Sequence, residues 1–393
     1  MSKDSKLDLA AFRRGSVDLI EERELLSRIS EGEPLRVKFG MDPSSADLHA
    51  GHAIPLLKLR DLQQLGHQIV LIVGDSTAMV GDPSGKNQLR PQLTREAVEA
   101  NLETYTHQAG KILDLERTEI RRNSEWFDAM DFEGVLRLCA RMTVARMIER
   151  DTFQKRMKES EAVGIHEFLY PLMQGWDSVQ VKADVELGGT DQLFNLLVGR
   201  NLQEQEGQRP QICVTTPLIN GTDGRKMSKS YGNALHFEDT PEDVFGKTMS
   251  VEDEVMEVWY TQLTRVPEED ISSLLAGHPR DAKARLAKEM VTLLHGEDAA
   301  QQAASAFDRQ FRSKELPDDI PEVAWPGDGG LPLANLLREL GLASSGGEAR
   351  RLVTQGGVRL DGEVATEAMQ VVEPPKEELL IQVGKRRFAR VRA

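Results

Sequence analysis

The stretch Val37–His52 constrains the fold of this chain more than any other segment. Its first residues alternate between apolar and polar as in a strand, a glycine and a proline then interrupt the pattern, and a helix begins at about Gly51. Free N–H groups and the positive end of the helix dipole should converge there, which predicts an anion site where His49 and His52 donate to a phosphate. A plain βα turn with an Asp-Pro-Ser break fits the same residues.

Strands and helices alternate over residues 36–230, which predicts an α/β, doubly wound, Rossmann-like catalytic domain. Ile69–Val73 is a continuous apolar run typical of a buried parallel strand, so the first βαβ unit should span roughly residues 36–74. The other predicted elements are helices over 5–30, 94–113, 132–139, 143–159, 166–182 and 191–204 (the last capped by Thr190), and strands over 119–122, 184–187 and 212–215.

Shifts in pattern along the chain predict four segments. The catalytic domain covers residues 1–238, with a less regular insertion at about 75–165, and an all-helical domain follows over 239–315. Residues 316–330 are rich in proline, glycine and aspartate and are interpreted as a linker. The last segment, 331–393, is predicted to be a small α+β domain.

Composition narrows the class of protein. The chain has 393 residues, of which 39% are hydrophobic and 29% charged, as in an ordinary soluble globular protein. Two cysteines, Cys139 and Cys213, exclude a disulfide framework and a cysteine zinc site, and they favour a reducing, cytoplasmic location. We expect no signal peptide and no membrane span, because no long apolar run occurs.

Charge is distributed unevenly. The net charge of −15 argues against non-specific binding of nucleic acid by the whole surface. Residues 331–393 nevertheless carry ten basic and eight acidic side chains, and the final ten residues include no acid. This segment could therefore form a local basic patch for RNA, although a solvated basic tail is an alternative interpretation.

A second motif, Lys226-Met-Ser-Lys-Ser230, lies in a polar, glycine-rich loop over residues 220–233. Lys226 and Lys229 on such a loop can close over a polyphosphate and stabilise charge as it develops. A solvated loop that happens to contain two lysines is the alternative.

Together these motifs resemble a known family. His49-Ala-Gly-His52 resembles the His-Ile-Gly-His element, and Lys226–Ser230 matches the KMSKS element, of class I aminoacyl-tRNA synthetases. The motifs between them resemble the bacterial tyrosyl-tRNA synthetase family, and the resemblance covers about residues 30–393. It implies ATP-dependent activation of L-tyrosine, transfer to the 3′ end of tRNA(Tyr), Mg²⁺ bound through the phosphates without a structural metal, a helical anticodon-binding domain over 239–315, and a cytoplasmic homodimer.

The predicted helix over 166–182 carries Tyr170, Gln174 and Asp177 on one face. A half-exposed helix would have the same stripe of polar residues. The spacing Tyr-x-x-x-Gln-x-x-Asp is similar to the tyrosine pocket of the family. That similarity implies that Tyr170 and Gln174 hold the substrate amino group and that Asp177 takes the phenol hydroxyl.

Two further turns fit the same resemblance. Gly188-Gly-Thr-Asp-Gln192 could be only a tight turn, but glycines at the end of a strand also allow a ligand to approach the backbone. The family match implies Gly189 and Asp191 at the ribose and Gln192 near the substrate carboxylate. In the opening stretch, the residues expected to flank the nucleotide are Gly40, Asp42, Ser44 and Gly51.

The loop Gly81–Lys86 has good β-turn chemistry and is not a P-loop, because no serine or threonine follows the lysine. The resemblance implies Asp82 at the substrate ammonium, with Lys86 and Arg90 near the phosphates or the tRNA end. The predicted catalytic residues, which stabilise charge rather than attack the substrate, are therefore His49, His52, Lys226, Lys229, Lys86 and Arg90.

The C-terminal segment resembles a small RNA-binding module shared with a ribosomal small-subunit protein. Short helices are expected over 333–340 and 347–355. The side chains predicted to meet the RNA backbone are Arg350, Arg351, Lys385, Arg386 and Arg387.

The chain departs from the family pattern at two positions. Lys38 stands where the family often has a tyrosine that shares the phenol hydroxyl, and Leu193 replaces a usual tryptophan. Fewer groups should therefore contact the phenol hydroxyl, or another group should supply the missing contact. A tryptophanyl-tRNA synthetase, a small-molecule nucleotidyltransferase of the same superfamily and a non-catalytic RNA-binding regulator are the alternative functions.

Overall fold

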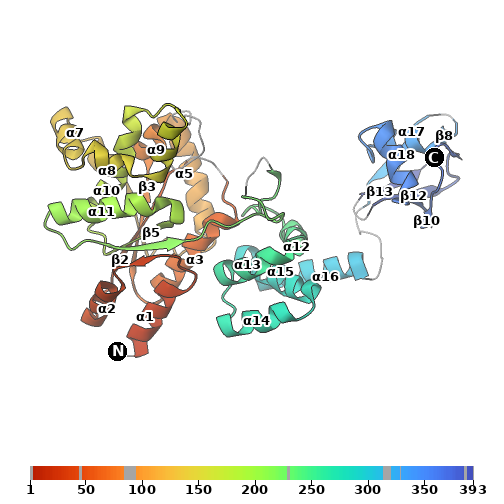
Figure 1. Ribbon diagram of the computed structural model, residues 1–393. Coiled ribbons are helices and arrows are strands. Elements are labelled where there is room, and N and C mark those ends of the chain that lie inside the picture. The colour runs from red at the N-terminus through yellow and green to blue at the C-terminus, as the bar shows by residue number, and fades with distance from the viewer. Residues whose placement is uncertain are drawn as a thin grey trace. The chain divides into compact units, whose positions relative to one another are not determined.

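The computed structural model describes residues 3–43, 47–83, 94–227, 231–312, 320–327, 329–384 and 387–392. The chain forms two compact units, residues 1–307 and 308–393. Figure 1 shows both units, and each is described by itself.

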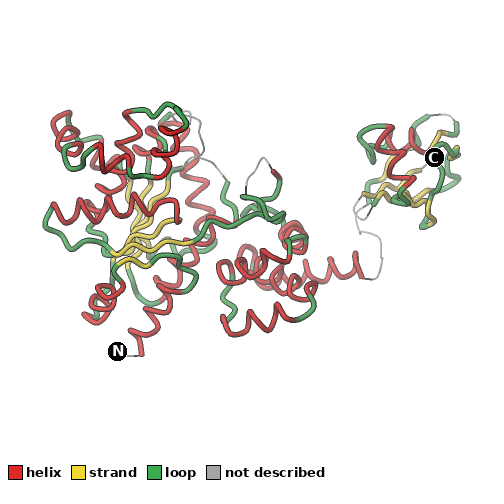
Figure 2. Tube along the Cα trace, viewed as in Figure 1, coloured by secondary structure: helices red, strands yellow, loops and turns green. Residues whose placement is uncertain are grey.

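The sheet of the first unit is formed by β1 (Leu19–Ile20), β2 (Arg36–Met41), β3 (Gln68–Val73), β4 (Thr118–Arg122), β5 (Val185–Gly189) and β6 (Ile212–Thr216). Figure 2 draws these strands in yellow between helices. Their order is β1-β6-β5-β2-β3-β4, and only β1 runs antiparallel to its neighbour. The chain moves outward from β2 to β4 and returns to β5 on the other side of β2. The strand order therefore reverses between β2 and β5, where open α/β sheets bind ligands outside the carboxyl ends of their strands.

Helices cover both faces of this sheet. In β3, Leu71 and Val73 belong to the main apolar core, whereas Val70 and Ile72 pack with Val181 in a separate cluster. Alternate side chains of a strand point to opposite faces, so both faces are buried, as in a parallel sheet. The predicted Rossmann-like, doubly wound fold is confirmed.

The helices of this part of the chain are α1 (Lys3–Arg13), α2 (Glu22–Glu31), α3 (Ala50–Gln64), α4 (Asp75–Val80), α5 (Arg95–Ala109), α6 (Ser124–Phe127), α7 (Phe132–Cys139), α8 (Val144–Ile148), α9 (Asp151–Lys158), η1 (Ile165–Phe168), α10 (Leu169–Val181), η2 (Thr190–Gln192) and α11 (Leu193–Gln205).

Three of the predicted elements are wrong in detail. The single helix over 5–30 is two helices, because Gly15 adopts a φ of 62° and the chain then forms β1 against β6. The helix over 143–159 is divided into α8 and α9. Thr190 does not cap the helix after β5, because it begins the short η2 turn and α11 starts only at Leu193. Apolar periodicity does not register such short interruptions.

An all-helical segment ends the first unit, and its last helix extends beyond residue 307. Its members are α12 (Pro241–Met249), η4 (Asp253–Val255), α13 (Met256–Leu263), α14 (Glu268–Ala276), α15 (Pro279–His295) and α16 (Glu297–Arg312). Trp259 of α13 is buried, and its Nε1 donates to the carbonyl of Asn220 at 3.2 Å. Arg265 forms an ion pair with Asp61 of α3 at 2.8 Å. These contacts fix the helices against the carboxyl end of α3 and the loop that follows β6. Across the described ranges, no helix combines the length and apolar content needed to cross a membrane.

The second unit is a small α+β domain with its own core, in which Leu333, Leu336, Val353, Ile381 and Val391 are buried. One sheet has the order β10-β9-β12-β13-β7, and β8 pairs with β11. Ser345 caps α18 by accepting from the N–H of Glu348 at 3.2 Å. The elements are β7 (Glu322–Ala324), β8 (Leu331–Pro332), α17 (Leu333–Glu339), α18 (Gly346–Thr354), β9 (Val358–Leu360), β10 (Glu363–Val364), β11 (Val371–Val372), β12 (Glu378–Val383) and β13 (Arg387–Arg392).

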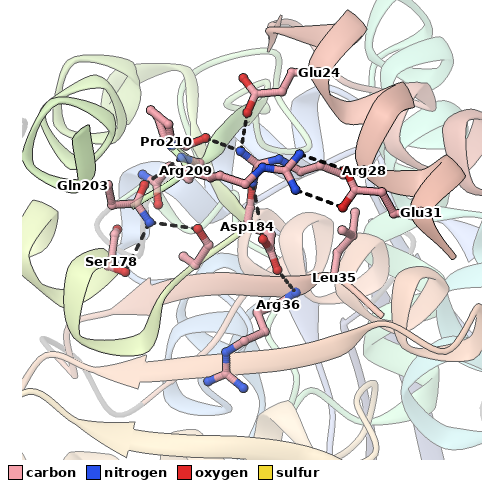
Figure 3. A network of polar contacts seen from close by, with 12 residues as sticks. Glu24, Arg28, Glu31, Leu35, Arg36, Ser178, Asp184, Gln203, Arg209 and Pro210 are labelled. Atoms are coloured by element: carbon pink, nitrogen blue, oxygen red, sulfur yellow. Dashed lines mark hydrogen bonds and ion pairs between the residues drawn. The ribbon is translucent and has the colours of Figure 1, made fainter. Parts of the chain in front are cut away.

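A buried arginine fixes the amino ends of the two central strands (Figure 3). Arg28 of α2 is 1% exposed and donates to the carbonyl of Asp184 at 2.9 Å. The carboxylate of Asp184 also accepts from the N–H of Arg36 at 2.9 Å. Because Arg36 begins β2 and Asp184 precedes β5, this network aligns the starts of the strands whose opposite ends form the candidate site.

Candidate active site

A cavity opens at the carboxyl ends of β2 and β5, at the point where the strand order reverses. Every predicted site residue that the structure describes in the first unit lines this cavity. Those residues are Gly40, Asp42, His49, Gly51, His52, Asp82, Tyr170, Gln174, Asp177, Gly189, Asp191, Gln192 and Lys226. Ser44, Lys86, Arg90 and Lys229 lie outside the described residues. Residues more than 180 positions apart in the chain thus share one site.

The two histidines at the start of α3 act as caps of their own helix. The Nδ1 atom of His49 accepts from the N–H of Gly51, and the Nδ1 atom of His52 accepts from the N–H of His49, each at 3.2 Å. The prediction of free N–H groups at this helix start is therefore wrong, since the N–H groups of Ala50, Gly51 and His52 all have partners. A neutral histidine that accepts at Nδ1 carries its proton at Nε2. Each ring can therefore donate from Nε2 to an anion.

The segment after the lysine motif is hydrogen-bonded directly to the histidine motif. The N–H of Ala50 donates to the carbonyl of Leu235 at 2.8 Å, and the N–H of Phe237 donates to the carbonyl of Leu48 at 3.0 Å. The amide of Asn233 donates to Asp223 at 2.7 Å and to the Lys226 carbonyl at 3.2 Å. The loop that carries Lys226 is therefore closed at its base and attached beside His49.

A first hydrogen-bond network crosses one side of the cavity. Trp126 Nε1 donates to Asp177 Oδ1 at 2.9 Å, and Asn123 Nδ2 lies 3.4 Å from Asp177 Oδ2. Asn123 Nδ2 also donates to Thr77 Oγ1 at 3.1 Å, and Thr77 Oγ1 donates to Asp42 Oδ1 at 2.7 Å. The Tyr170 hydroxyl completes the chain by donating to Asp42. Asp42, which the family resemblance predicts beside the nucleotide, thus hydrogen-bonds to residues of the predicted amino-acid pocket.

Burial sets the protonation behaviour of this network. Burial raises the pKa of Asp177 to about 7, while the Lys38 ammonium and the hydrogen bonds from Trp126 and Asn123 oppose the shift. Burial and the neighbouring Asp42 carboxylate raise the pKa of the Tyr170 hydroxyl. Tyr170 is therefore a neutral hydrogen-bond donor, and Asp177 changes charge near neutral pH.

A second network forms the other side of the cavity. Gln192 Nε2 donates to Asp82 Oδ2 at 2.8 Å, and Arg150, which is 3% exposed, lies 3.3 Å from Asp82 Oδ1. Asn195 uses both amide protons, donating to Gln174 Oε1 at 2.9 Å and to Gln192 Oε1 at 2.8 Å. Acceptor oxygens of Asp82, Gln174 and Gln192 are thus fixed around one part of the cavity, in the manner that a cationic group requires.

Lys38 does not contribute to the cavity wall. Its ammonium pairs with Glu186 of β5 at 2.9 Å, and both side chains are fully buried. Lys38 at this position predicts either fewer contacts to the phenol hydroxyl or a contact from another group. In the structure, Trp126 and Asn123 hydrogen-bond to the carboxylate of Asp177, and neither of them lines the cavity.

Six polar residues that belong to the two networks or hydrogen-bond to them are absent from the sequence predictions. They are Thr77, Asn123, Trp126, Arg150, Glu186 and Asn195. Asn123 could have been found, because it directly follows a strand that ends at the ligand-binding edge of the sheet. Glu186 could also have been found, because an acid inside an apolar strand requires a buried partner. The remaining four carry no local signal.

The basic residues of the second unit differ in their surroundings. Arg350 and Arg351 on α18 are exposed. Arg387 is partly engaged within its own domain, donating to the Leu342 carbonyl at 2.7 Å and lying 3.3 Å from Glu348. Lys385 and Arg386 lie outside the described residues.

The Rossmann-like sheet, the histidine pair at its switch point and the lysine loop attached beside that pair define a class I aminoacyl-tRNA synthetase. Residues 30–312 match the family described as tRNA synthetases class I (W and Y), and residues 331–375 match the S4 domain. The chain therefore belongs to the tryptophan and tyrosine branch of the class I synthetases.

Individual relatives agree with this assignment. The chain is 52% identical to a tyrosine–tRNA ligase of Thermotoga maritima, over 97% of this chain and 96% of that protein. It is 50% identical to a tyrosine–tRNA ligase of Thiobacillus denitrificans, over 98% of each. A truncated mitochondrial tyrosyl-tRNA synthetase from Aspergillus nidulans has the same fold, with a TM-score of 0.65 at 24% identity over 78% of this chain and 94% of that chain.

Proposed function

We propose that this enzyme activates L-tyrosine with ATP and transfers it to the 3′ end of tRNA(Tyr). In the first step, a carboxylate oxygen of tyrosine attacks the α-phosphorus of ATP, the bond to the bridging oxygen breaks, and pyrophosphate leaves. In the second step, a hydroxyl of the terminal adenosine attacks the tyrosyl carbonyl carbon and AMP leaves. The observation that carries the proposal is the single cavity shared by the histidine motif, Lys226 and both polar networks.

The two networks support the placement of tyrosine. We assign its ammonium to the acceptor oxygens of Asp82 and Gln174, with Tyr170 beside them, and its carboxylate to the region of Gln192. The phenol hydroxyl is assigned to Asp177, whose carboxyl is held by Trp126 and Asn123. A buried partner that a phenol satisfies is left unpaired by phenylalanine, which favours tyrosine.

ATP is assigned to the part of the cavity beside α3. His49 and His52 donate from Nε2 to the phosphates, and Lys226 and Lys229 stabilise the charge that develops on pyrophosphate. Lys86 and Arg90 are proposed near the same phosphates, and the residues proposed to flank the nucleotide are Gly40, Asp42, Ser44, Gly51, Gly189 and Asp191. Catalysis then consists of positioning and charge stabilisation, without a protein nucleophile.

Mg²⁺ is proposed to bind through the phosphates of ATP, as is usual for this ion at nucleotide sites. Its role would be to neutralise charge on the leaving pyrophosphate. Within the described ranges, no cluster of three His, Cys, Asp or Glu side chains is suited to hold a metal ion. No protein ligand is therefore assigned to it.

The tRNA is assigned to the segments beyond the catalytic part. We propose that residues 239–315 bind the anticodon region and that residues 331–393 bind the RNA backbone. β7 (Glu322–Ala324) lies inside the predicted linker 316–330 but pairs with β13, so it belongs to the second unit. The exposed Arg350 and Arg351 support this role, and Lys385, Arg386 and Arg387 are proposed to extend the same surface. A cytoplasmic location stays a prediction.

A homodimer is proposed from an apolar surface on the insertion. Phe132 and Leu136 on α7, Val144 on α8 and Ile165 on η1 are exposed by 76%, 53%, 64% and 85%. Large apolar side chains that stay exposed in the single chain are typical of a protein interface. The combined Phe132→Asp and Ile165→Asp substitutions should yield a monomer in sedimentation velocity, and an unchanged dimer would refute this surface.

Amino-acid-dependent ATP–pyrophosphate exchange tests the main proposal. We expect exchange with L-tyrosine and not with L-tryptophan, followed by charging of tRNA(Tyr). Asp177→Ala should reduce the preference for tyrosine over phenylalanine, whereas Asp75→Ala, a matched loss of a carboxylate outside the cavity lining, should leave that preference unchanged. Exchange only with tryptophan, or formation of a nucleotidyl product without any amino acid, would favour one of the alternative functions.

A further inference from the structure

Directly behind the cavity, β2 and β5 carry a buried pair of opposite charges. Lys38 and Glu186 are register partners on these neighbouring strands, both side chains are 0% exposed, and Nζ lies 2.9 Å from Oε1. Burying two charges costs free energy that their attraction does not always repay, so such a pair often has a role other than stability. Neither residue lines the cavity.

Lys38 binds one turn of α10. Its three ammonium protons have three acceptors, namely the carbonyl of Gln174 at 2.7 Å, the hydroxyl of Ser178 at 2.7 Å and the carboxylate of Glu186. Because Gln174 and Ser178 are one helical turn apart, this contact fixes the height and rotation of α10 at the cavity wall.

Glu186 fixes the side chain of Gln174. Its Oε1 accepts from Gln174 Nε2 at 3.1 Å, and its Oε2 accepts from Ser178 at 3.1 Å and from Gln211. An ionised carboxylate can only accept hydrogen bonds, so the nitrogen end of the Gln174 amide must face it. The oxygen end of the same amide then faces Asn195 and the cavity.

We propose that Lys38 and Glu186 are positioning residues that hold Gln174 with its amide oxygen toward the substrate ammonium. A flipped amide would direct its NH₂ group at the substrate ammonium. Both groups are donors, so no hydrogen bond could form between them. Lys38 is needed because its ammonium pairs with the buried Glu186 carboxylate, which without it would be an uncompensated buried charge. This inference rests on the assignment of Gln174 to the ammonium in the proposed function.

Binding of two ligands that differ only in the ammonium tests the inference. The dissociation constants of L-tyrosine and of 3-(4-hydroxyphenyl)propionate, which lacks the amino group, are measured by calorimetry. The variants are Lys38→Met and the double Lys38→Met, Glu186→Leu, the second of which leaves no unpaired charge and is expected to fold. In the double variant, which removes two charges with opposite effects on the pKa of Asp177, affinity for L-tyrosine should fall roughly tenfold, as for one charge-assisted hydrogen bond, with little change for the propionate. Lys38→Met alone should lower affinity for L-tyrosine more than affinity for the propionate.

Two controls separate positioning from a general structural effect. Arg28→Met removes another buried charge that binds the same pair of strands at their far ends, and it should affect both ligands equally or not at all. In a Gln174→Leu background, adding the double substitution should produce no further loss for L-tyrosine, because the group being positioned is already absent.

The outcomes distinguish this inference from the proposed function. Parallel losses for both ligands, no loss for either, or a wild type that binds them equally would overturn the inference. If the wild type binds L-tyrosine more tightly than the propionate but supports no ATP–pyrophosphate exchange, the proposed function fails. In that case the selective loss in the variants still supports positioning of Gln174.

Discussion

The hydroxyl of Tyr170 donates to the Oδ2 atom of Asp42 at 2.8 Å, which joins α10 to the loop that follows β2. Asp42 also accepts from Thr77 on α4, so one carboxylate links three elements around the cavity. The cavity wall is thus held by side-chain hydrogen bonds, whose loss should affect both stability and binding.

Tyr170→Phe should destabilise the protein by about 1–2 kcal/mol, because a hydrogen bond to a partly buried carboxylate is lost. It should also raise the KM for L-tyrosine in the exchange assay several-fold. Tyr260→Phe is a matched control, since that buried hydroxyl donates to the carbonyl of Ala282 far from the cavity lining. Urea unfolding should report similar losses for both variants, and an equal rise of KM in the control would contradict the assignment.

Asp177 should make stability depend on pH. Its pKa is about 7 in the folded state, against about 4 in an unfolded chain. Between these values the folded state holds a proton that the unfolded state has released, so the free energy of unfolding falls as pH rises. Asp177→Asn removes this contribution. Relative to wild type, the variant should therefore gain up to about 3 kcal/mol on going from pH 5 to pH 8, measured by urea unfolding. Parallel pH profiles would contradict the shift.

The cap and the phosphate contact of His49 should be separable. Asparagine is a good N-cap residue but cannot place a donor where Nε2 of histidine lies. His49→Asn should therefore keep the thermal stability of wild type while lowering kcat for exchange by about 100-fold or more. His49→Ala should lower both. If His49→Asn retained full kcat, His49 would be only a cap.

The S4 arginines should govern the salt dependence of tRNA binding. Arg350→Ala with Arg351→Ala should weaken binding and reduce the slope of log affinity against log salt by about one to two, because up to two phosphate contacts are lost. Filter binding at several salt concentrations measures this slope. Arg338→Ala in the same domain is the control, because Arg338 is paired with Glu339. Equal effects from the control would indicate a diffuse charge effect.

Much of the site could be predicted because its residues occur in compact, spaced motifs at the ends of strands. His49, Gly189 and Asp191 belong to strand–turn–helix segments, and parallel strands bring such segments to one edge. The partner of Lys38 could not be predicted, because the pairing depends on the register of β2 against β5. Likewise, only the fold places Thr77 and Asn123, which lie 46 residues apart, within hydrogen-bond distance.

The errors in secondary structure have a common physical cause. The segment 5–30 has helical spacing throughout, yet the interruption at Gly15 and the pairing of Leu19 with Val214 are tertiary features. At the start of α3, the sequence predicts free N–H groups, whereas the histidine rings themselves satisfy two of them. In both cases long-range packing or side-chain capping overrides a local pattern.

The hydrogen bonds between Leu48–Ala50 and Leu235–Phe237 have a consequence for folding during synthesis of the protein. These segments are separated by nearly two hundred residues of chain. At ribosomal rates of about 5–20 residues per second, the histidine motif must wait roughly 10–40 s after its synthesis before its backbone partner exists. During translation, the nascent chain therefore passes through a long period in which the part of the cavity beside the histidine motif cannot be completed.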